Sequence, residues 1–236
     1  MTQSNNEKND RREIFGWLTY DWANSAFFTT VVTVLAGPYI TALAQNDVGK
    51  SGVVLSLGPA GSITADNLFT STLGVSIFLQ IFLLPLLGSI ADFTPLKKKM
   101  MAGFCYVGVI SSSLLFFING DSYLWGCLFL LIANICFAAS NVFYNSFLVD
   151  ITTEDKRDST SSYGYAAGYL GGLIMLVLNL GLITFGSSYG IDQGLAVRIS
   201  MLAASLWWGI FAAVTFYLVR SRTPERIETG KRLISV

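Results

Sequence analysis

The sequence predicts an all-α membrane protein with six transmembrane helices, and its composition is the first reason. Of its 236 residues, 53% are hydrophobic and only 13% are charged, whereas charged residues make up roughly a quarter of soluble domains. The mean hydropathy is +0.56. This composition excludes a disordered chain, and it leaves too few charged side chains to cover a water-soluble surface.

The apolar residues fall into six segments, each long enough to cross a membrane. The hydrocarbon core is about 30 Å thick, which takes roughly 20 helical residues. The segments do not alternate between apolar and polar residues, so helices are strongly preferred over transmembrane β-strands. Among the charged residues, only Asp21 and Arg198 fall inside these segments. We predict transmembrane helices over Trp17 to Ala44, Asn67 to Ala91, Met100 to Asn119, Tyr123 to Val149, Thr160 to Gly186 and Gly194 to Val219.

The basic residues predict how these helices are oriented. All lysines and arginines except Lys50 and Arg198 precede the first segment or follow the second, the fourth or the sixth. Because short loops rich in Lys and Arg stay in the cytoplasm, both termini are predicted to be cytoplasmic. We therefore expect a cytoplasmic tail over residues 1–16, a six-helix bundle over 17–219, and a second tail or the start of a central linker over 220–236.

The sequence contains no motif that indicates an enzyme or a cofactor site. It has no His. Its three cysteines, Cys105, Cys127 and Cys136, lie inside predicted helices, which indicates neither a metal site nor a disulfide framework. There is no Walker-type phosphate-binding loop, and no pair of carboxylates lies at membrane depth. We expect no metal, no cofactor, no enzymatic activity and no nucleic-acid partner.

Polar residues inside the first segment are candidates for a functional site, because polar groups within a membrane are costly unless they face a partner or a water-filled cavity. Asp21, Asn24 and Ser25 share one helix face, which Thr29 and Thr33 extend. One hypothesis makes this face the lining of a solute path, with Asp21 as the proton-coupling carboxylate. In the alternative, Asp21 lies within the first two turns of the helix, where a carboxylate favours the positive end of the helix dipole.

The fourth segment carries three asparagines, Asn134, Asn141 and Asn145, with Tyr144 beside them. At about 100° per residue, the three amides fall on one stripe of a helix. Such a stripe binds solute through neutral donors and acceptors. Equally, its amides hydrogen-bond to neighbouring helices and hold the bundle together.

The fifth segment contains glycines at a strict four-residue spacing, namely Gly164, Gly168 and Gly172. Small residues repeated in this way let two helix backbones approach closely in a membrane. We predict that these glycines form a helix-packing seam.

The loop after the second segment combines Gly88, Asp92 and a basic cluster that includes Lys97 and Lys98. A turn in a Lys-rich cytoplasmic loop explains this pattern on its own. The loop also resembles the signature of the major facilitator superfamily, Gly-xxx-Asp-(Arg/Lys)-x-Gly-Arg-(Arg/Lys). These four residues match the signature, whereas the residues between Asp92 and Lys97 depart from it.

Further stretches resemble the vacuole effluxer family, the branch of this superfamily that contains the autophagy-related vacuolar amino-acid exporters. The similarity runs from about Ile14 to Arg220. The stretches in the first and fourth segments are specific enough to carry it. The matching stretches are Tyr20 to Phe27, Val142 to Ile151, Gly168 to Gly172, and Trp207 with Trp208.

This resemblance implies an N-terminal half of a major facilitator, built from two three-helix repeats, in a transporter that rocks two six-helix halves about a central site. It implies secondary active transport of a small polar solute by alternating access, with an amino acid as the expected substrate. The implied substrate-binding residues are Asn24, Asn141, Asn145 and Tyr144. The implied conformational gating residues are Gly88, Asp92, Lys97, Lys98, Asp150 and Arg157.

An alternative function follows from the length of the chain, since complete members of the family have twelve helices. In this alternative, the chain is a truncated or split six-helix protein that serves as a partner subunit or scaffold and transports nothing alone. Besides the solute and the bilayer, the expected partner is a second six-helix half or a second copy. The expected location is the inner or plasma membrane of the cell, with the vacuolar membrane as the alternative.

Overall fold

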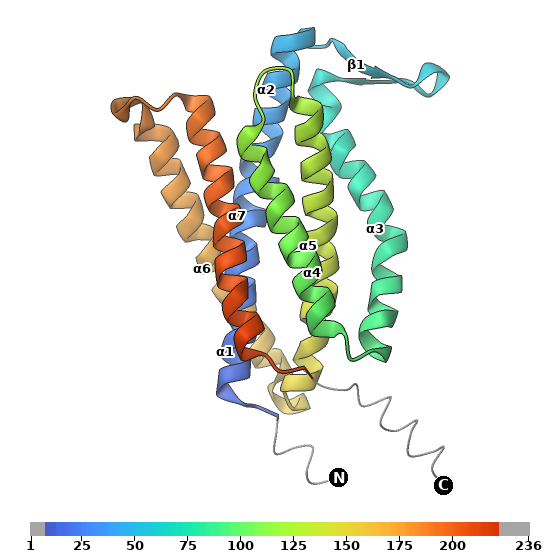
Figure 1. Cartoon of the computed structure of the whole chain (residues 1–236), viewed down its shortest axis with the longest axis vertical. Helices are drawn as coiled ribbons and strands as arrows, with labels where there is room; N and C mark the ends of the chain where they lie inside the picture. The colour runs from blue at the N-terminus through green and yellow to red at the C-terminus, as the bar shows by residue number, and fades with distance from the viewer. Residues whose placement is uncertain (1–7, 222–236) are drawn as a thin grey trace.

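The computed structural model describes residues 8–221, within which six membrane-length helical spans run side by side (Figure 1). The first span is continuous from Arg11 to Val48. It consists of α1 (Arg11–Phe27), the π-helix η2 (Phe28–Leu35) and α2 (Ala36–Val48). The other spans contain α3 (Leu68–Phe93), α4 (Lys97–Ser113), α5 (Tyr123–Ile151), α6 (Glu154–Phe185) and α7 (Gln193–Leu218).

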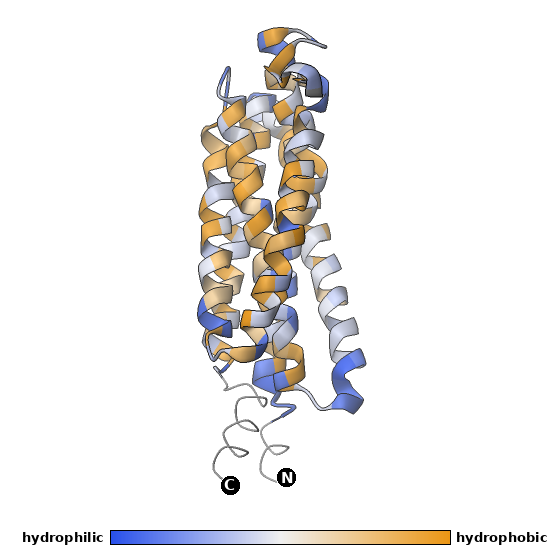
Figure 2. Cartoon of the chain, turned by 90° about the vertical axis from the view of Figure 1, so that its right-hand side faces the viewer, coloured by the Kyte–Doolittle hydropathy of each residue, from blue (hydrophilic) through white to orange (hydrophobic). Residues whose placement is uncertain are grey.

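The six predicted transmembrane helices are confirmed, but several begin or end beyond the predicted bounds. The first helix starts at Arg11, with Asp10 as its N-cap, whereas hydropathy placed its start at Trp17. The fifth span starts at Glu154, whereas Thr160 was predicted. The reason is that hydropathy detects only the apolar part of a helix, and these helices continue as polar turns beyond it. Figure 2 shows this pattern, with apolar residues along the middle of the bundle and hydrophilic residues gathered toward its ends.

The described chain begins and finishes at the same end of the bundle (Figure 1). The connections from α3 to α4 and from α5 to α6 lie at that end as well. Most of the tail expected over residues 220–236 lies outside the described residues. We refer below to this end as the polar end, because the predicted cytoplasmic loops lie there.

The first span is the centre of the bundle. α1 packs most extensively against α7 and α6, while α5 packs against α3 and α4. Large side chains of the core are fully buried between these helices, including Tyr20 and Phe27 of α1, Phe143 of α5 and Trp208 of α7. α3 is the least buried of the spans. Its outer face carries exposed apolar side chains such as Phe82.

Glycines bring the backbones of α1 and α6 into close approach. A Cβ atom added at Gly171 would lie 2.3 Å from the carbonyl oxygen of Trp22, which is too close for any real side chain. A Cβ at Gly164 would lie 2.8 Å from the ring of Trp17, and one at Gly168 would lie 2.7 Å from Ser25 Oγ. Gly172 in the same way meets Thr29. We call the contact made by these four glycines the glycine seam. The two helices run parallel to each other along it.

Hydrogen bonds at the polar end join segments that are far apart in the sequence. The amide N–H of Asn9 donates to the Ile151 carbonyl oxygen at 2.7 Å, and the Asn9 side chain bonds to Thr153 Oγ1 at 2.9 Å. Glu13 is fully buried and accepts the backbone N–H of Arg220 at 2.9 Å. The start of α1 is thereby tied both to the turn between α5 and α6 and to the end of α7.

The opposite end carries a feature that sequence patterns did not predict. Between α2 and α3 the chain forms a small antiparallel hairpin of β1 (Val53–Ser56) and β2 (Ser62–Thr64), which projects to one side of the bundle (Figure 1). Short 3₁₀ turns complete the connections at η3 (Gly58–Ala60), η4 (Ala65–Asn67), η5 (Leu114–Phe117) and η6 (Gly186–Tyr189).

The glycine seam predicts a position-dependent effect of adding one methyl group to α6. Gly171→Ala forces α1 and α6 apart, and we expect it to destabilise the fold by about 1–3 kcal/mol, the usual cost of overpacking. Gly181→Ala on the same helix is the matched control, because a Cβ there meets nothing within 4 Å. Thermal unfolding of the purified chain in detergent measures both variants. Equal unfolding temperatures for the two variants would contradict the close approach.

Candidate functional site

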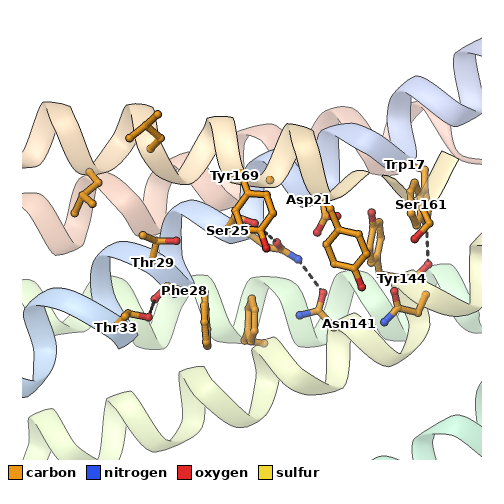
Figure 3. Close-up of a pocket in the computed structure, with 17 residues that line it drawn as sticks. Trp17, Asp21, Ser25, Phe28, Thr29, Thr33, Asn141, Tyr144, Ser161 and Tyr169 are labelled. Atoms are coloured by element: carbon orange, nitrogen blue, oxygen red, sulfur yellow. Dashed lines mark hydrogen bonds between the residues drawn. The ribbon is translucent and has the colours of Figure 1, made fainter. Parts of the chain in front are cut away.

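A pocket of about 640 Å³ opens between the first span, α5 and α6 (Figure 3). Its walls come from three of the membrane-length spans, and polar groups inside a membrane are costly unless they face a partner or a water-filled cavity. Its walls combine hydroxyls, amides, a carboxylate and aromatic rings. The lining residues are Trp17, Asp21, Asn24, Ser25, Phe28, Thr29 and Thr33 of the first span, Phe137, Asn141, Tyr144 and Asn145 of α5, and Ser161, Tyr165, Gly168, Tyr169, Leu173 and Leu176 of α6.

The π-helix keeps a row of polar side chains on the pocket side of the first span. Asp21, Ser25, Thr29 and Thr33 recur every four residues, and all four line the pocket. In an α-helix each four-residue step drifts by about 40°, so a regular helix would turn Thr33 roughly 120° away from Asp21. A π-helix has about 4.4 residues per turn, so a four-residue step within it drifts back by roughly 30°. The wider turn over Phe28–Leu35 therefore offsets part of the drift.

Two asparagines meet across the pocket. Asn24 Nδ2 donates to Asn141 Oδ1 at 2.8 Å, joining α1 to α5. Asn24 is 2% exposed, so this bond satisfies a donor that water does not reach. Among the described residues the side-chain N–H groups of Asn141 donate to no other side chain, and Asn145 lies one helical turn further along the same wall.

Asp21 lies nearly three turns into the first span and not at its start. α1 begins at Arg11, so Asp21 is about 15 Å, or nearly three turns, beyond the first residue. The hypothesis that this carboxylate serves the helix dipole is therefore wrong, because the dipole effect is confined to the first turn. Instead, Asp21 is half-buried and packs against α6 at Gly164 and Gly168.

Aromatic rings form the wall nearest to Asp21. Trp17 stacks on Tyr144 with ring centroids 4.4 Å apart, and the Trp17 indole N–H donates to the Tyr144 carbonyl oxygen at 2.9 Å. Deeper in the pocket, Phe28 stacks on Phe137 at 5.3 Å. These rings give the pocket apolar surface beside its polar row.

The α6 wall contains residues that the sequence reasoning missed. Ser161, Tyr165, Tyr169 and Leu173 all line the pocket. They recur every four residues, like the glycines of the seam, so one helix presents two parallel rows: glycines toward α1 and larger side chains toward the pocket. The same four-residue spacing would have found them.

Of the three asparagines predicted to share a stripe, Asn134 lies outside the pocket. Its side chain donates to Ser76 Oγ of α3 at 3.0 Å and is buried. For this residue, the structure favours the role of an interhelical bond, whereas Asn141 and Asn145 face the pocket. The three asparagines have different surroundings because α3 covers the part of α5 that contains Asn134 and leaves the part with Asn141 and Asn145 open.

The proposed gating residues lie at the polar end, away from the pocket lining. Lys97 at the start of α4 forms an ion pair of 2.7 Å with Asp150 near the end of α5, and the two side chains are only 8% and 17% exposed. Asp92 is exposed, while Gly88 faces Val142 with room for a side chain. Arg157 has a buried Nε atom that finds no hydrogen-bond partner in the described part of the chain. Lys98 is half-buried beside Lys97.

Within residues 8–221 no group of three or more His, Cys, Asp or Glu side chains is placed to hold a metal ion. The three cysteines are free and buried. The pocket contains a single carboxylate and no nucleophile paired with a base. Its chemistry is that of binding through hydrogen bonds, one negative charge and aromatic surface.

The sequence matches one family of known proteins. The sequence profile described as "Vacuole effluxer Atg22 like" matches residues 9–159 and 149–236. The "Uncharacterized MFS-type transporter YxiO" of Bacillus subtilis is 34% identical over 199 residues, which cover 83% of this chain and 44% of that protein. "Autophagy-related protein 22" of Chaetomium globosum is 26% identical over 159 residues, or 58% of this chain and 24% of that protein.

A further relative, "Autophagy-related protein 22-1" of Penicillium rubens, is 21% identical over 320 residues, which cover 93% of this chain and 53% of that protein. The chain thus spans about half or less of the length of these relatives. No solved structure matches the chain with significant similarity.

The pocket predicts which positions water-soluble thiol reagents reach. In a variant with its three native cysteines replaced by Ala, Asn145→Cys lines the open pocket and is expected to react at least about tenfold faster than Ser205→Cys, because thiolate chemistry requires exposure. Ser205 is a suitable control since it is fully buried in α7. The rates are measured in liposomes with a membrane-impermeant methanethiosulfonate that is supplied on both sides of the membrane. Similar rates at the two positions would contradict an open pocket.

Proposed function

The chain belongs to the Atg22-like vacuole effluxer family, and from this premise we propose that it is one six-helix half of a secondary transporter that moves a small polar solute by alternating access. The observation that carries the proposal is the polar pocket at membrane depth, built from the first span, α5 and α6. Polar side chains that face a cavity within a membrane mark solute paths. Transporters of this kind hold their solute near the midplane, between repeats of helices.

We propose Asn24, Asn141 and Asn145, together with Tyr144, as the residues that contact the solute. Three of them present amide groups to the pocket, and amides both donate and accept hydrogen bonds without adding charge. The proposed substrate is an amino acid, whose ammonium and carboxylate groups and variable side chain suit a lining of amides, hydroxyls and aromatic rings. The similarity to an MFS-type transporter supports transport as the function.

Alternating access requires a second six-helix half, and we propose that it packs beside this one. The pocket is open on the side where Tyr165 and Tyr169 of α6 are exposed. Without such a partner, the chain would instead act as a subunit or scaffold that transports nothing alone. The ion pair between Lys97 and Asp150 is proposed to hold α4 and α5 together at the polar end while the halves rock.

The chain is a multi-pass membrane protein, with six helices long and apolar enough to span a bilayer within the described residues. We propose that its polar end, with both termini, faces the cytoplasm, because the basic residues gather there. The inner or plasma membrane is the proposed location, and the vacuolar membrane is the alternative suggested by the fungal relatives.

The solute site predicts that pocket asparagines matter for transport and that a neighbouring asparagine does not. Asn24→Ala and Asn141→Ala each remove a polar contact of the pocket, and we expect each to lower amino-acid flux by about tenfold, the effect of roughly 1.4 kcal/mol. Asn134→Ala is the matched control on α5, because that side chain faces α3. Radiolabelled amino-acid flux in proteoliposomes measures all three. Unchanged flux in both pocket variants would refute the site, and no flux in the wild-type chain alone would favour the subunit role.

The carboxylate of Asp21 is also proposed to couple transport to protons, because it is the only acidic residue of the pocket lining. In that case a pH gradient across the proteoliposome membrane drives solute accumulation in the wild type. Asp21→Asn should lose accumulation driven by the gradient, and whatever flux remains should run only downhill, since an amide cannot carry the proton. Accumulation that does not respond to the gradient, or that survives in Asp21→Asn, would remove this role.

A further inference from the structure

The charge of the pocket is unbalanced. Asp21 is the only ionisable acid of the lining, and no lysine or arginine lines the pocket in the part of the chain that the structure describes. The negative charge lies on a helix of membrane-spanning length, and a charge inside a membrane is costly when nothing compensates it. A solute with a positive charge would remove that imbalance.

The surroundings of Asp21 offer it no cation. Its carboxylate packs against the glycine seam, and a Cβ added at Gly164 would lie 3.0 Å from Asp21 Oδ2. Two ion pairs, between Lys97 and Asp150 and between Arg220 and Asp10, lie at the polar end. The Tyr144 hydroxyl lies beside the carboxylate but is buried without a hydrogen bond of ordinary length and angle. The described residues thus give the Asp21 carboxylate one neighbouring hydroxyl and no cation.

Exposed aromatic rings line the pocket near Asp21. Trp17 and Asp21 both pack on Gly164 of α6, where an added Cβ would lie 2.8 Å from Trp17 Cζ3 and 3.0 Å from Asp21 Oδ2. Trp17 stacks on Tyr144 and both rings are buried, so the open ring surface comes from Tyr165 and Tyr169 of α6, which are 65% and 79% exposed. Aromatic rings attract cations through their faces. A carboxylate beside aromatic rings is a combination that suits an alkylammonium group.

We propose that the solute of this half carries an ammonium group, which binds the Asp21 carboxylate beside the exposed rings of Tyr165 and Tyr169. This inference rests on the proposed transport function and narrows its substrate class. A carboxylate on the solute is not required, because this half offers only neutral donors such as Asn141 for it. The apolar part of the solute packs on Phe28 and Leu173 at the far side of the pocket.

Three compounds of similar size separate the two charged groups of an amino acid. Leucine has both groups, 3-methylbutylamine has only the ammonium, and 4-methylpentanoate has only the carboxylate. We expect leucine and the amine to bind the chain in lipid nanodiscs, measured by calorimetry, and the carboxylate to bind at least about tenfold more weakly. Asp21→Asn should weaken amine binding by about tenfold or more. Asp158→Asn, an exposed acid on α6 outside the pocket, should leave it unchanged.

Thiol labelling tests the same charge preference without a solute. In the variant whose native cysteines are replaced, Thr29→Cys lies in the pocket lining. We expect the cationic ethylammonium methanethiosulfonate to react faster than the anionic ethylsulfonate reagent, and the ratio of the two rates to fall at least about threefold when Asp21→Asn is added. Reaction with the neutral methyl reagent reports whether the pocket stays open in each variant.

The results separate the inference from the function on which it rests. Three results would each overturn the ammonium assignment. They are binding of 4-methylpentanoate as tight as that of the amine, failure of the amine to bind, and a ratio of labelling rates that Asp21→Asn does not change. Measured flux of an uncharged solute alongside such results would leave the transporter proposal standing. Conversely, amine binding that depends on Asp21, with no flux of any solute, would keep the ammonium site and reject transport by this chain.

Discussion

The close approach of α1 and α6 at the glycine seam is the contact on which the rest of the structure depends. Where Gly171 meets the carbonyl oxygen of Trp22, no side chain fits between the two backbones. In a membrane, helices gain little from the hydrophobic effect when they associate, so close packing of this kind carries much of the association. The seam fixes α6 against α1, and the row of larger side chains on α6 then faces the space next to Asp21.

The six spans could be predicted from the sequence because each contains a long apolar run. Such a run indicates a transmembrane helix whatever the neighbouring segments are. The four-residue spacing of glycines likewise indicated a close helix contact, but not that the partner helix is α1. Hydropathy misplaced the start of α1, which begins at Arg11, since its first turns are polar. That error allowed a dipole role for Asp21, which the longer helix excludes.

Other features could not be predicted because they depend on tertiary context. A π-helix has no clear composition of its own, so the eight residues of η2 read as ordinary apolar helix. Asn134 bonds to α3 whereas Asn141 faces the pocket, because α3 packs against only part of α5. The periodicity of α5 alone does not show which part α3 covers. The aromatic wall is made by three separate spans, and only their packing brings Trp17, Tyr144 and Tyr169 to one pocket.

The two walls of the pocket differ in how they can change over evolution. Where α6 touches α1, the wall is made by main chain and glycine, which have no rotamers and accept no larger residue. Tyr165 and Tyr169 of α6 and Asn145 of α5 are exposed side chains of the pocket, so each can be exchanged without disturbing the packing of the helices. In relatives with the same fold, a change of solute would therefore come from substitutions at positions such as Tyr169 and Asn145, while the glycine seam is unchanged.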